Sequence, residues 1–260
     1  MIFISLSVYA LAKELGADDA VAEVHRQLAE LAAVSRASEA ALVPTLWPGG
    51  ILPACKAIAR LRLLDEVELR IDAGATCIGK ARSRAFHAFR KSAASTWVSI
   101  DDDVDATTQT LEWLVEAVRC PSREPKICLA PCLLRGPRQE PTLNVELPQV
   151  VRHRRLSNGG LVRNCNGGGF GLVALNRAAV DAVLTVAKLD ERSIWLDDDG
   201  ETKLAVFHDE LSEGKWWGED RSFFRRLPRD VYIECLASGV VAHDGAVLDL
   251  SKVPELGAPF

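Results

Sequence analysis

Short apolar runs alternate with amphipathic stretches along most of this chain. Six runs rich in branched or aromatic residues have the length of buried strands: 2–8, 67–71, 97–100, 127–131, 170–175 and 231–233. Four intervening stretches carry apolar residues at steps of three and four, as one face of a helix does: 20–33, 81–92, 107–118 and 178–188. The alternation predicts an α/β sheet with helices on both faces. Asp105 is the predicted N-cap of the third helix.

Two polar stretches interrupt this alternation. Residues 134–166 are rich in Arg, Pro, Gly and Asn, and residues 197–217 open with three acids and a glycine. Both patterns are typical of long loops. Long ordered loops in a compact domain usually carry function, so we expect the substrate-specific surface there.

Composition fits one α/β domain covering residues 1–260, because 48% of the 260 residues are hydrophobic and 26% are charged. The net charge of −5 predicts no general attraction to phosphate backbones or anionic membranes. The seven cysteines lack the paired spacing of a zinc site and favour reduced thiols in a cytoplasm. The apolar start, 2–8, is too short to cross a bilayer, so we expect no membrane span.

Three adjacent carboxylates, Asp101, Asp102 and Asp103, directly follow the apolar run 97–100. This places them at the carboxyl end of a central strand, where open α/β sheets bind ligands. A divalent cation such as Mg²⁺ or Mn²⁺ would offset their mutual repulsion and bridge them to substrate phosphates. On an extended backbone, Asp101 and Asp103 would point together and Asp102 away. The alternative is an acidic surface turn that caps the next helix.

A phosphate-binding loop is a competing interpretation of residues Gly74 to Lys80. This segment matches the P-loop pattern except at its last position, where Ala81 replaces the hydroxyl residue that holds Mg²⁺. With Asp101 as the acid on a second strand, the chain would be a nucleoside triphosphatase or a small-molecule kinase. The missing hydroxyl removes a metal ligand and weighs against this interpretation.

The second half of the chain carries glycines, aromatics and acids that suit a sugar site. Glycines at 167–169 would let the backbone approach a ligand closely, although a flexible turn gives the same pattern. Trp216 and Trp217 precede Glu219 and Asp220. Aromatic faces bind sugar rings, and a carboxylate can accept a hydroxyl proton. The structural alternative is a core aromatic pair before the acidic first turn of a helix.

His243 follows an apolar run near the end of the chain. Its imidazole would complete a metal shell with Asp103. A single histidine is more often structural, so its combination with the acidic triplet and the Glu-Asp pair is what favours a ligand role.

The order of these motifs resembles that of GT-A fold glycosyltransferases, similar to family 2, from bacteria and phages. The resemblance rests on five segments: Ala81-Arg82-Ser83-Arg84, Trp97 to Asp103, Gly168 to Arg177, Gly218 to Arg226, and His243. It implies one Rossmann-like domain with a central mixed, mainly parallel sheet flanked by helices. Residues 1–103 would form the nucleotide-binding half, and residues 104–250 the acceptor-binding and catalytic half.

The resemblance also implies residue roles. Asp103 and His243 would bind Mn²⁺ or Mg²⁺, and a nucleotide diphosphate sugar would be the donor. The donor contacts would come from the nucleotide-binding half: Tyr9 at the base, Lys80 and Arg82 at the phosphates, Asp101 at the nucleotide or its ribose, and Asp102 beside it. Ser83 stands where the family usually has asparagine, which leaves the donor contact at this position open.

Catalysis in this resemblance belongs to the Glu-Asp pair. Asp220 would deprotonate the acceptor hydroxyl, and Glu219 would bind acceptor hydroxyls. Similar motifs act in inverting relatives, and the sequence leaves retention open. Trp216, Trp217, Gly168 and Gly169 would contact the acceptor.

The acceptor itself is not specified by the sequence. A glycan or a small molecule fits the motifs, and the run Arg152–Arg155, with Arg135, Arg138 and Arg163, suggests a basic patch for an anionic acceptor such as nucleic acid. A binding protein that keeps the fold without catalysis is the third interpretation.

Overall fold

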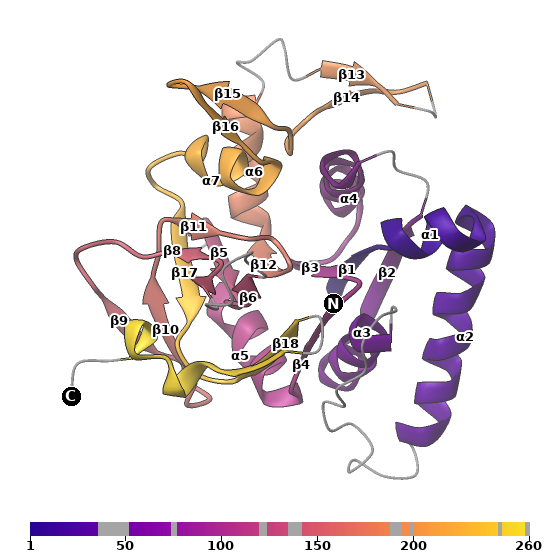
Figure 1. The fold of residues 1–260 in the computed structure, drawn as a ribbon, viewed down its shortest axis with the longest axis horizontal. Coiled ribbons are helices and arrows are strands. Elements are labelled where there is room, and N and C mark those ends of the chain that lie inside the picture. Colours follow the sequence, from indigo (N-terminus) through magenta and orange to yellow (C-terminus); the bar gives the residue numbers. More distant parts are fainter. Residues whose placement is uncertain are drawn as a thin grey trace.

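One eight-stranded mixed sheet forms the centre of the molecule (Figure 1). The structure is a computed structural model that describes residues 1–35, 52–73, 77–119, 124–134, 142–187, 194–197, 200–243 and 246–257. The strand order is β2-β1-β3-β12-β5-β17-β10-β9, and β12 and β10 run against the other strands. An α/β fold with a mixed sheet is therefore confirmed.

All six predicted strands lie in this sheet. Their bounds are β1 Ile2–Ser7, β2 Val67–Asp72, β3 Thr96–Asp101, β5 Lys126–Leu129, β12 Leu172–Asn176 and β17 Tyr232–Leu236. β10 (Leu161–Asn164) and β9 (His153–Arg155) extend one edge. Branched and aromatic residues form these strands because both faces of the central ones are covered, which favours continuous apolar runs.

Helices cover both faces of the sheet, as the alternation predicts. The four predicted helices are α2 Ala17–Ser35, α4 Ile78–Lys91, α5 Thr108–Val118 and α6 Arg177–Ala187. α4 and α6 lie on one side of the sheet in Figure 1, and α5 lies on the other with α3 (Leu52–Leu64). Two helices were not predicted, α3 and the short α1 (Tyr9–Leu15). α7 (Glu219–Arg225) begins on the Glu-Asp pair.

Trp97 of β3 lies at the centre of the hydrophobic core. It is fully buried, and its indole N–H donates to Ser5 Oγ of β1 at 2.8 Å. Phe86, Phe89 and Phe170 pack around its ring with centroids 6.0 to 6.2 Å away. This packing joins α4, β3 and the glycine-rich segment, so the core fixes the elements that carry the candidate site.

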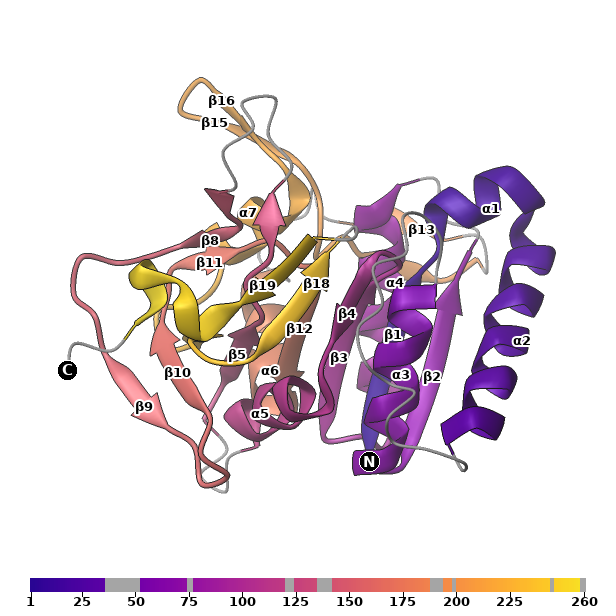
Figure 2. The same cartoon turned by 60° about the horizontal axis from the view of Figure 1, so that its bottom comes forward.

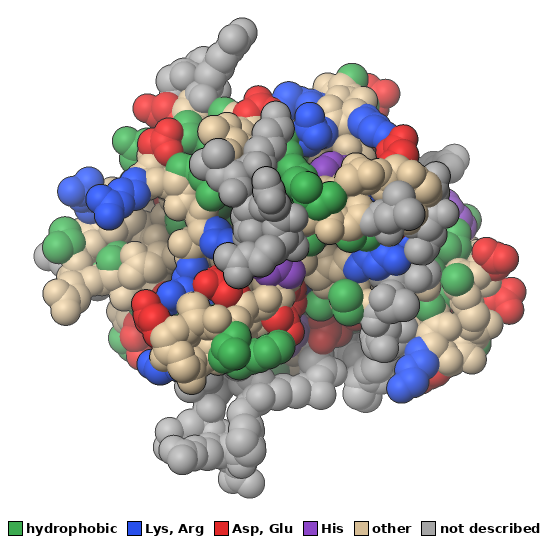
Figure 3. Space-filling model, turned by 90° about the horizontal axis from the view of Figure 1, so that it is seen from above, with side chains coloured by type: hydrophobic (Ala, Val, Ile, Leu, Met, Phe, Trp, Pro, Cys, Tyr) green, Lys and Arg blue, Asp and Glu red, His purple; other side chains and the backbone are tan. Residues whose placement is uncertain are grey.

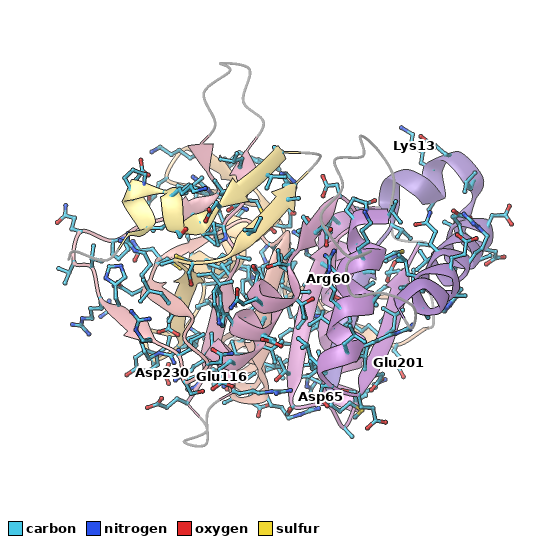
Figure 4. All side chains as sticks on the ribbon, turned by 90° about the horizontal axis from the view of Figure 1, so that it is seen from below. Lys13, Arg60, Asp65, Glu116, Glu201 and Asp230 are labelled. Carbon is cyan, nitrogen blue, oxygen red and sulfur yellow. The ribbon has the colours of Figure 1, made fainter. Side chains whose placement is uncertain are left out.

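The predicted N-cap at Asp105 is wrong, because this carboxylate is buried and ion-paired. Thr107 caps α5, and its hydroxyl accepts the Thr110 N–H at 3.3 Å. Asp105 instead pairs with Arg60 of α3, which also donates to the Ala106 carbonyl at 2.6 Å. Figure 4 labels Arg60 on α3 in the middle of the molecule. The Arg60–Asp105 ion pair holds β4 (Val104–Ala106) against α3.

The two predicted loops contain short strands, so the prediction of irregular structure is wrong in part. The first holds β6 Leu133–Leu134, β7 Thr142–Leu143, β8 Val145–Glu146, β9 and β10. The second holds β14 Thr202–Leu204, β15 Glu210–Ser212 and β16 Lys215–Trp217, and β14 pairs with β13 Ile194–Leu196. Strands of two to four residues escape a pattern search because they show too few alternations.

A separate three-stranded sheet has the order β19-β18-β4. β18 is Val240–His243 and β19 is Ala246–Asp249, and two short 3₁₀ helices follow, Leu250–Lys252 and Pro254–Leu256. His243 pairs with Val104 across β18 and β4. Among the described residues, no helix is long and apolar enough to cross a membrane.

Candidate active site

The candidate site lies where the parallel strands β1, β2 and β3 end together. Ser7 pairs with Asp72 on one side and Asp101 on the other. The backbone N–H of Asp101 donates to the Gly171 carbonyl at 2.8 Å, which brings the glycine-rich segment to the same edge. Asp102 and Asp103 then turn into β4. The prediction of extended backbone through the triplet is therefore wrong, since the strand ends at Asp101.

Asp103 and His243 meet although 140 positions separate them in the printed sequence. Asp103 Oδ2 lies 3.3 Å from His243 Nε2, and His243 Nδ1 lies 2.9 Å from the Leu133 carbonyl. A carbonyl oxygen only accepts, so Nδ1 carries the proton and donates it. The hydrogen bond to Asp103 raises the pKa of His243 above its ordinary value, while burial opposes this rise.

This pair fits one divalent cation. Ligands next to each other in an octahedron with bonds of about 2.1 Å lie about 3 Å apart, close to the separation of these two atoms. The Nδ1–H bond to a carbonyl is the arrangement that leaves Nε2 as the metal-binding nitrogen. Among the described residues, no three His, Cys, Asp or Glu side chains form a metal-binding group. Phosphate oxygens and water would have to supply the remaining ligands, as is common for Mg²⁺.

Arg82 of α4 gathers the carboxylates of the site around one buried guanidinium. Its side chain is 2% exposed and donates to both Asp101 oxygens, at 2.9 and 3.0 Å. It also donates to Glu219 Oε1 at 2.9 Å and to Asp220. Burial opposes the charge on Arg82, but the carboxylates outweigh it and raise its pKa. The guanidinium thus faces protein carboxylates, and its predicted contact with donor phosphates stays a prediction.

Asp220 and Glu219 occupy the first turn of α7. Asp220 Oδ2 accepts the Phe170 N–H at 3.0 Å, which orients the carboxylate against the glycine-rich segment. Burial raises the pKa of Asp220 to about 6, and Glu219 and Asp101 add to the rise while Arg82 opposes it. A carboxyl with this pKa is mostly ionised at neutral pH and is a stronger base than an ordinary aspartate.

Asp102 lies in the turn beside this cluster. Burial, together with the adjacent charges of Asp103 and Asp101, raises its pKa to about 6. Its predicted donor contact is untested, as is that of Tyr9. Tyr9 begins α1 directly after β1, and its side chain lies outside the described part of the chain.

The glycines predicted to contact the acceptor pack closely against other residues of the protein. A Cβ on Gly168 would collide with the Asn144 carbonyl, and one on Gly169 would lie 2.7 Å from the Asn144 side chain. Gly167 has a φ of +140° and lies against Phe224. Packing alone therefore requires glycine at these positions, and acceptor contact stays a prediction.

Trp216 and Trp217 lie on β16, in the hairpin that projects from the body of the molecule in Figure 2. Trp216 is 69% exposed. Trp217 is half-buried, and the Arg225 guanidinium lies 4.3 Å from its ring centroid. Only Trp216 therefore presents a large open aromatic surface beside the candidate site's helix.

Lys80 and Arg84, on the first turns of α4, meet a carboxylate that the sequence analysis did not single out. Asp197 is 6% exposed, accepts from Arg84 at 2.7 Å and lies 3.9 Å from Lys80 Nζ. β2, a connecting segment and α4 follow one another as the P-loop interpretation requires, but residues 74–76 lie outside the described residues. Lys80 is thus beside an acid, which favours neither interpretation.

The predicted basic patch is wrong as a continuous exposed surface, although Arg152 and Arg155 are exposed as predicted. Arg163 is buried, and Arg154 pairs with Glu234. Arg135 and Arg138 lie outside the described residues. On the face shown in Figure 3, the visible Lys and Arg side chains are scattered among acidic ones. Strand geometry explains the difference, because neighbouring residues on a strand point to opposite faces.

Comparisons with known proteins identify no family. No protein-family model and no curated protein matches the chain. The solved structure of A197 from STIV is similar, with a TM-score of 0.47 and 14% sequence identity, over 97% of this chain and 91% of that one. The α/β architecture described above therefore rests on this chain's own structure.

Proposed function

We propose that this protein is a metal-dependent glycosyltransferase with a GT-A fold, which transfers a sugar from a nucleotide diphosphate donor to an acceptor hydroxyl. One observation supports this most strongly. Groups from β3, α4, α7 and β18 converge at the carboxyl edge of the sheet, with Asp103 and His243 paired beside the Arg82 cluster. Ligands of open α/β sheets bind at this edge.

The donor would bind across β3 and α4. Asp103 and His243 would hold Mn²⁺ or Mg²⁺, which neutralises the charge of the leaving diphosphate. Asp101 would meet the nucleotide or its ribose. Lys80, at the amino end of α4, lies where the helix dipole also favours phosphate.

Asp220 would act as the base on the acceptor side. The acceptor oxygen forms a bond to the anomeric carbon while the bond from that carbon to the diphosphate oxygen breaks. The hydroxyl proton passes to Asp220, whose other contacts, Arg82 and the Phe170 N–H, hold the carboxylate in place. One displacement of this kind inverts the anomeric centre. Glu219 would bind acceptor hydroxyls from the same helical turn.

Donor hydrolysis tests this proposal without knowledge of the acceptor. A panel of sugar nucleotides is first screened for a rise in melting temperature with and without Mn²⁺, because a ligand that binds only the folded state stabilises it. We then expect a slow, Mn²⁺-dependent release of nucleoside diphosphate from the stabilising donor. Phosphate release from ATP, without any response to sugar nucleotides, would instead support the P-loop interpretation.

A further inference from the structure

A cavity of about 950 Å³ lies between the outer strands and the C-terminal segment. Its walls come from the β9–β10 hairpin, the residues after β17 and the 3₁₀ helices that Figure 2 shows beside these strands. The polar or aromatic residues that matter here are Trp113, Arg155, Arg163, Ser238, Ser251 and Lys252. None of the candidate active-site residues lines it.

Arg163 is the unusual member of this cavity. It lies on β10 with 3% of its surface exposed. Among the described residues, its guanidinium has no hydrogen-bond acceptor and no carboxylate partner, and its Nε is fully buried. Buried charges in proteins are normally paired, because leaving water without compensation is costly. Arg163 therefore lacks the anion that its environment requires.

The remaining walls supply what an anionic small molecule needs. Arg155 adds positive charge at an exposed position. Lys252 is also exposed but pairs with Asp249 at 3.1 Å, and Glu255 is the acid among the lining residues. Ser238 Oγ accepts the Leu161 N–H at 3.0 Å, which leaves its hydroxyl proton available for donation. A volume of this size is typical of small-molecule sites and exceeds the need of a bare ion.

An aromatic surface also contributes to this cavity. The half-buried ring of Trp113 lies so close to Gly160 that a Cβ there would be 2.5 Å from it. Val253 and Pro254 provide apolar surface from the C-terminal segment. The cavity thus combines a charged end with apolar walls.

We propose that this cavity binds a small molecule that carries a phosphate group, with the phosphate on Arg163 and the rest of the molecule against Trp113 and Pro254. A guanidinium matches phosphate oxygens with two parallel donors, and the serine hydroxyl adds a third. The site is separate from the proposed transferase chemistry and does not depend on it.

Inorganic phosphate is the first probe, titrated at constant ionic strength while the melting temperature is measured. At phosphate about tenfold above its dissociation constant, we expect a rise of roughly 3–6 °C. Arg163→Met should abolish the rise. It should also melt higher than the wild type without phosphate, because it removes an uncompensated buried charge.

Three controls make the result specific. Arg152→Met makes the same change at an exposed arginine outside the cavity and should keep the phosphate response. Asp103→Ala should keep it too, which separates this site from the candidate active site. Acetate at equal ionic strength should have a smaller effect than phosphate.

Four outcomes would overturn the proposal. They are a flat phosphate response in the wild type, an equal response in Arg163→Met, an Arg163→Met protein that melts lower or fails to fold, and an acetate effect as large as that of phosphate. The last would assign the cavity to a carboxylate.

Discussion

Two buried arginines, Arg82 and Arg163, meet opposite surroundings in this molecule. They are 2% and 3% exposed, so the cost of removing each charge from water is similar. Arg82 contacts the carboxylates of Asp101, Glu219 and Asp220. Arg163 contacts none among the described residues. The charge of Arg82 is compensated by these carboxylates, whereas Arg163 has no such partner among the described residues. The same residue type therefore positions the proposed catalytic groups in one region and marks the proposed ligand site in the other.

The largest effect should come from the carboxylates that Arg82 positions. Asp220→Asn removes the proposed base, so transfer should fall at least about 10³-fold while donor binding is nearly unchanged. Steady-state turnover and calorimetric donor titration measure the two quantities. Asp230→Asn, at an exposed aspartate, is the matched control. Strong loss of donor affinity in Asp220→Asn would contradict this role.

Removal of Asp103, one of the two proposed metal ligands, should affect both donor binding and transfer. Asp103→Ala takes away one of the two proposed protein ligands, so Mn²⁺-dependent donor affinity should fall at least about 10²-fold and transfer should fall with it. Calorimetry with and without Mn²⁺ separates this change from a general loss of donor binding. Donor affinity that still depends on Mn²⁺ would show that the cation binds elsewhere.

The same substitution at both arginines tests whether their effects on the free energy of unfolding differ in sign. Arg82→Met leaves three carboxylates without their counter-charge, so the free energy of unfolding should fall by about 3–5 kcal/mol. Arg163→Met should change it in the opposite direction. Denaturant titration of both variants against Arg152→Met gives the values. Equal destabilisation by both would show that Arg163 also has a structural role.

We expect the rate of transfer to depend on pH through the ionisation of Asp220. Because a base acts in its ionised form, transfer should rise about tenfold per pH unit below about 6 and level off above pH 7.

The contribution of Asp220 to the free energy of unfolding should change with pH in the opposite direction. The folded pKa lies above the ordinary value of 3.8, so this group's contribution is present below that pH and is lost as pH rises through about 6. Asp220→Asn should remove the difference, and denaturant titrations at pH 4 and pH 7 would show it.

The smallest effect is expected at Trp216. Its side chain is 69% exposed, so Trp216→Ala should change the free energy of unfolding by less than about 0.5 kcal/mol. If the ring binds the acceptor, the KM for the acceptor should rise while kcat is largely kept. An unchanged KM would remove Trp216 from the proposed acceptor site, with Leu211→Ala on the same hairpin as the control.

Local patterns in the sequence were enough for the main elements of the fold. All six predicted strands and four predicted helices are present, because each carries a complete apolar pattern. α3 was missed since Lys56 and Arg60 occupy buried positions and interrupt its apolar face. Asp105 was misassigned for a related reason. An aspartate before a helix is a good N-cap candidate, and only the fold shows that Arg60 lies against it.

The sequence indicated which residues belong to the candidate site, but most of the contacts between them could not be predicted from it. The resemblance predicted that Asp103 and His243 would lie together, and the structure pairs them. It placed Arg82 at donor phosphates and did not predict its contacts with Glu219 and Asp220. Three features needed the structure: the sharing of Arg82 among carboxylates, the Asp197 pair with Arg84 and the isolation of Arg163. Each depends on residues far apart in the chain, and the presence or absence of a partner leaves no local signal.

In the proposed function, the position of Arg82 between Asp101 and the Glu-Asp pair would couple donor binding to the protonation of Asp220. One guanidinium interacts with a carboxylate on the donor side and with the proposed base on the acceptor side. Any donor that changes the charge at Asp101 therefore alters how strongly Arg82 holds Asp220, and hence the affinity of Asp220 for a proton. Linkage is reciprocal, so protonation of Asp220 would alter donor affinity by the same factor.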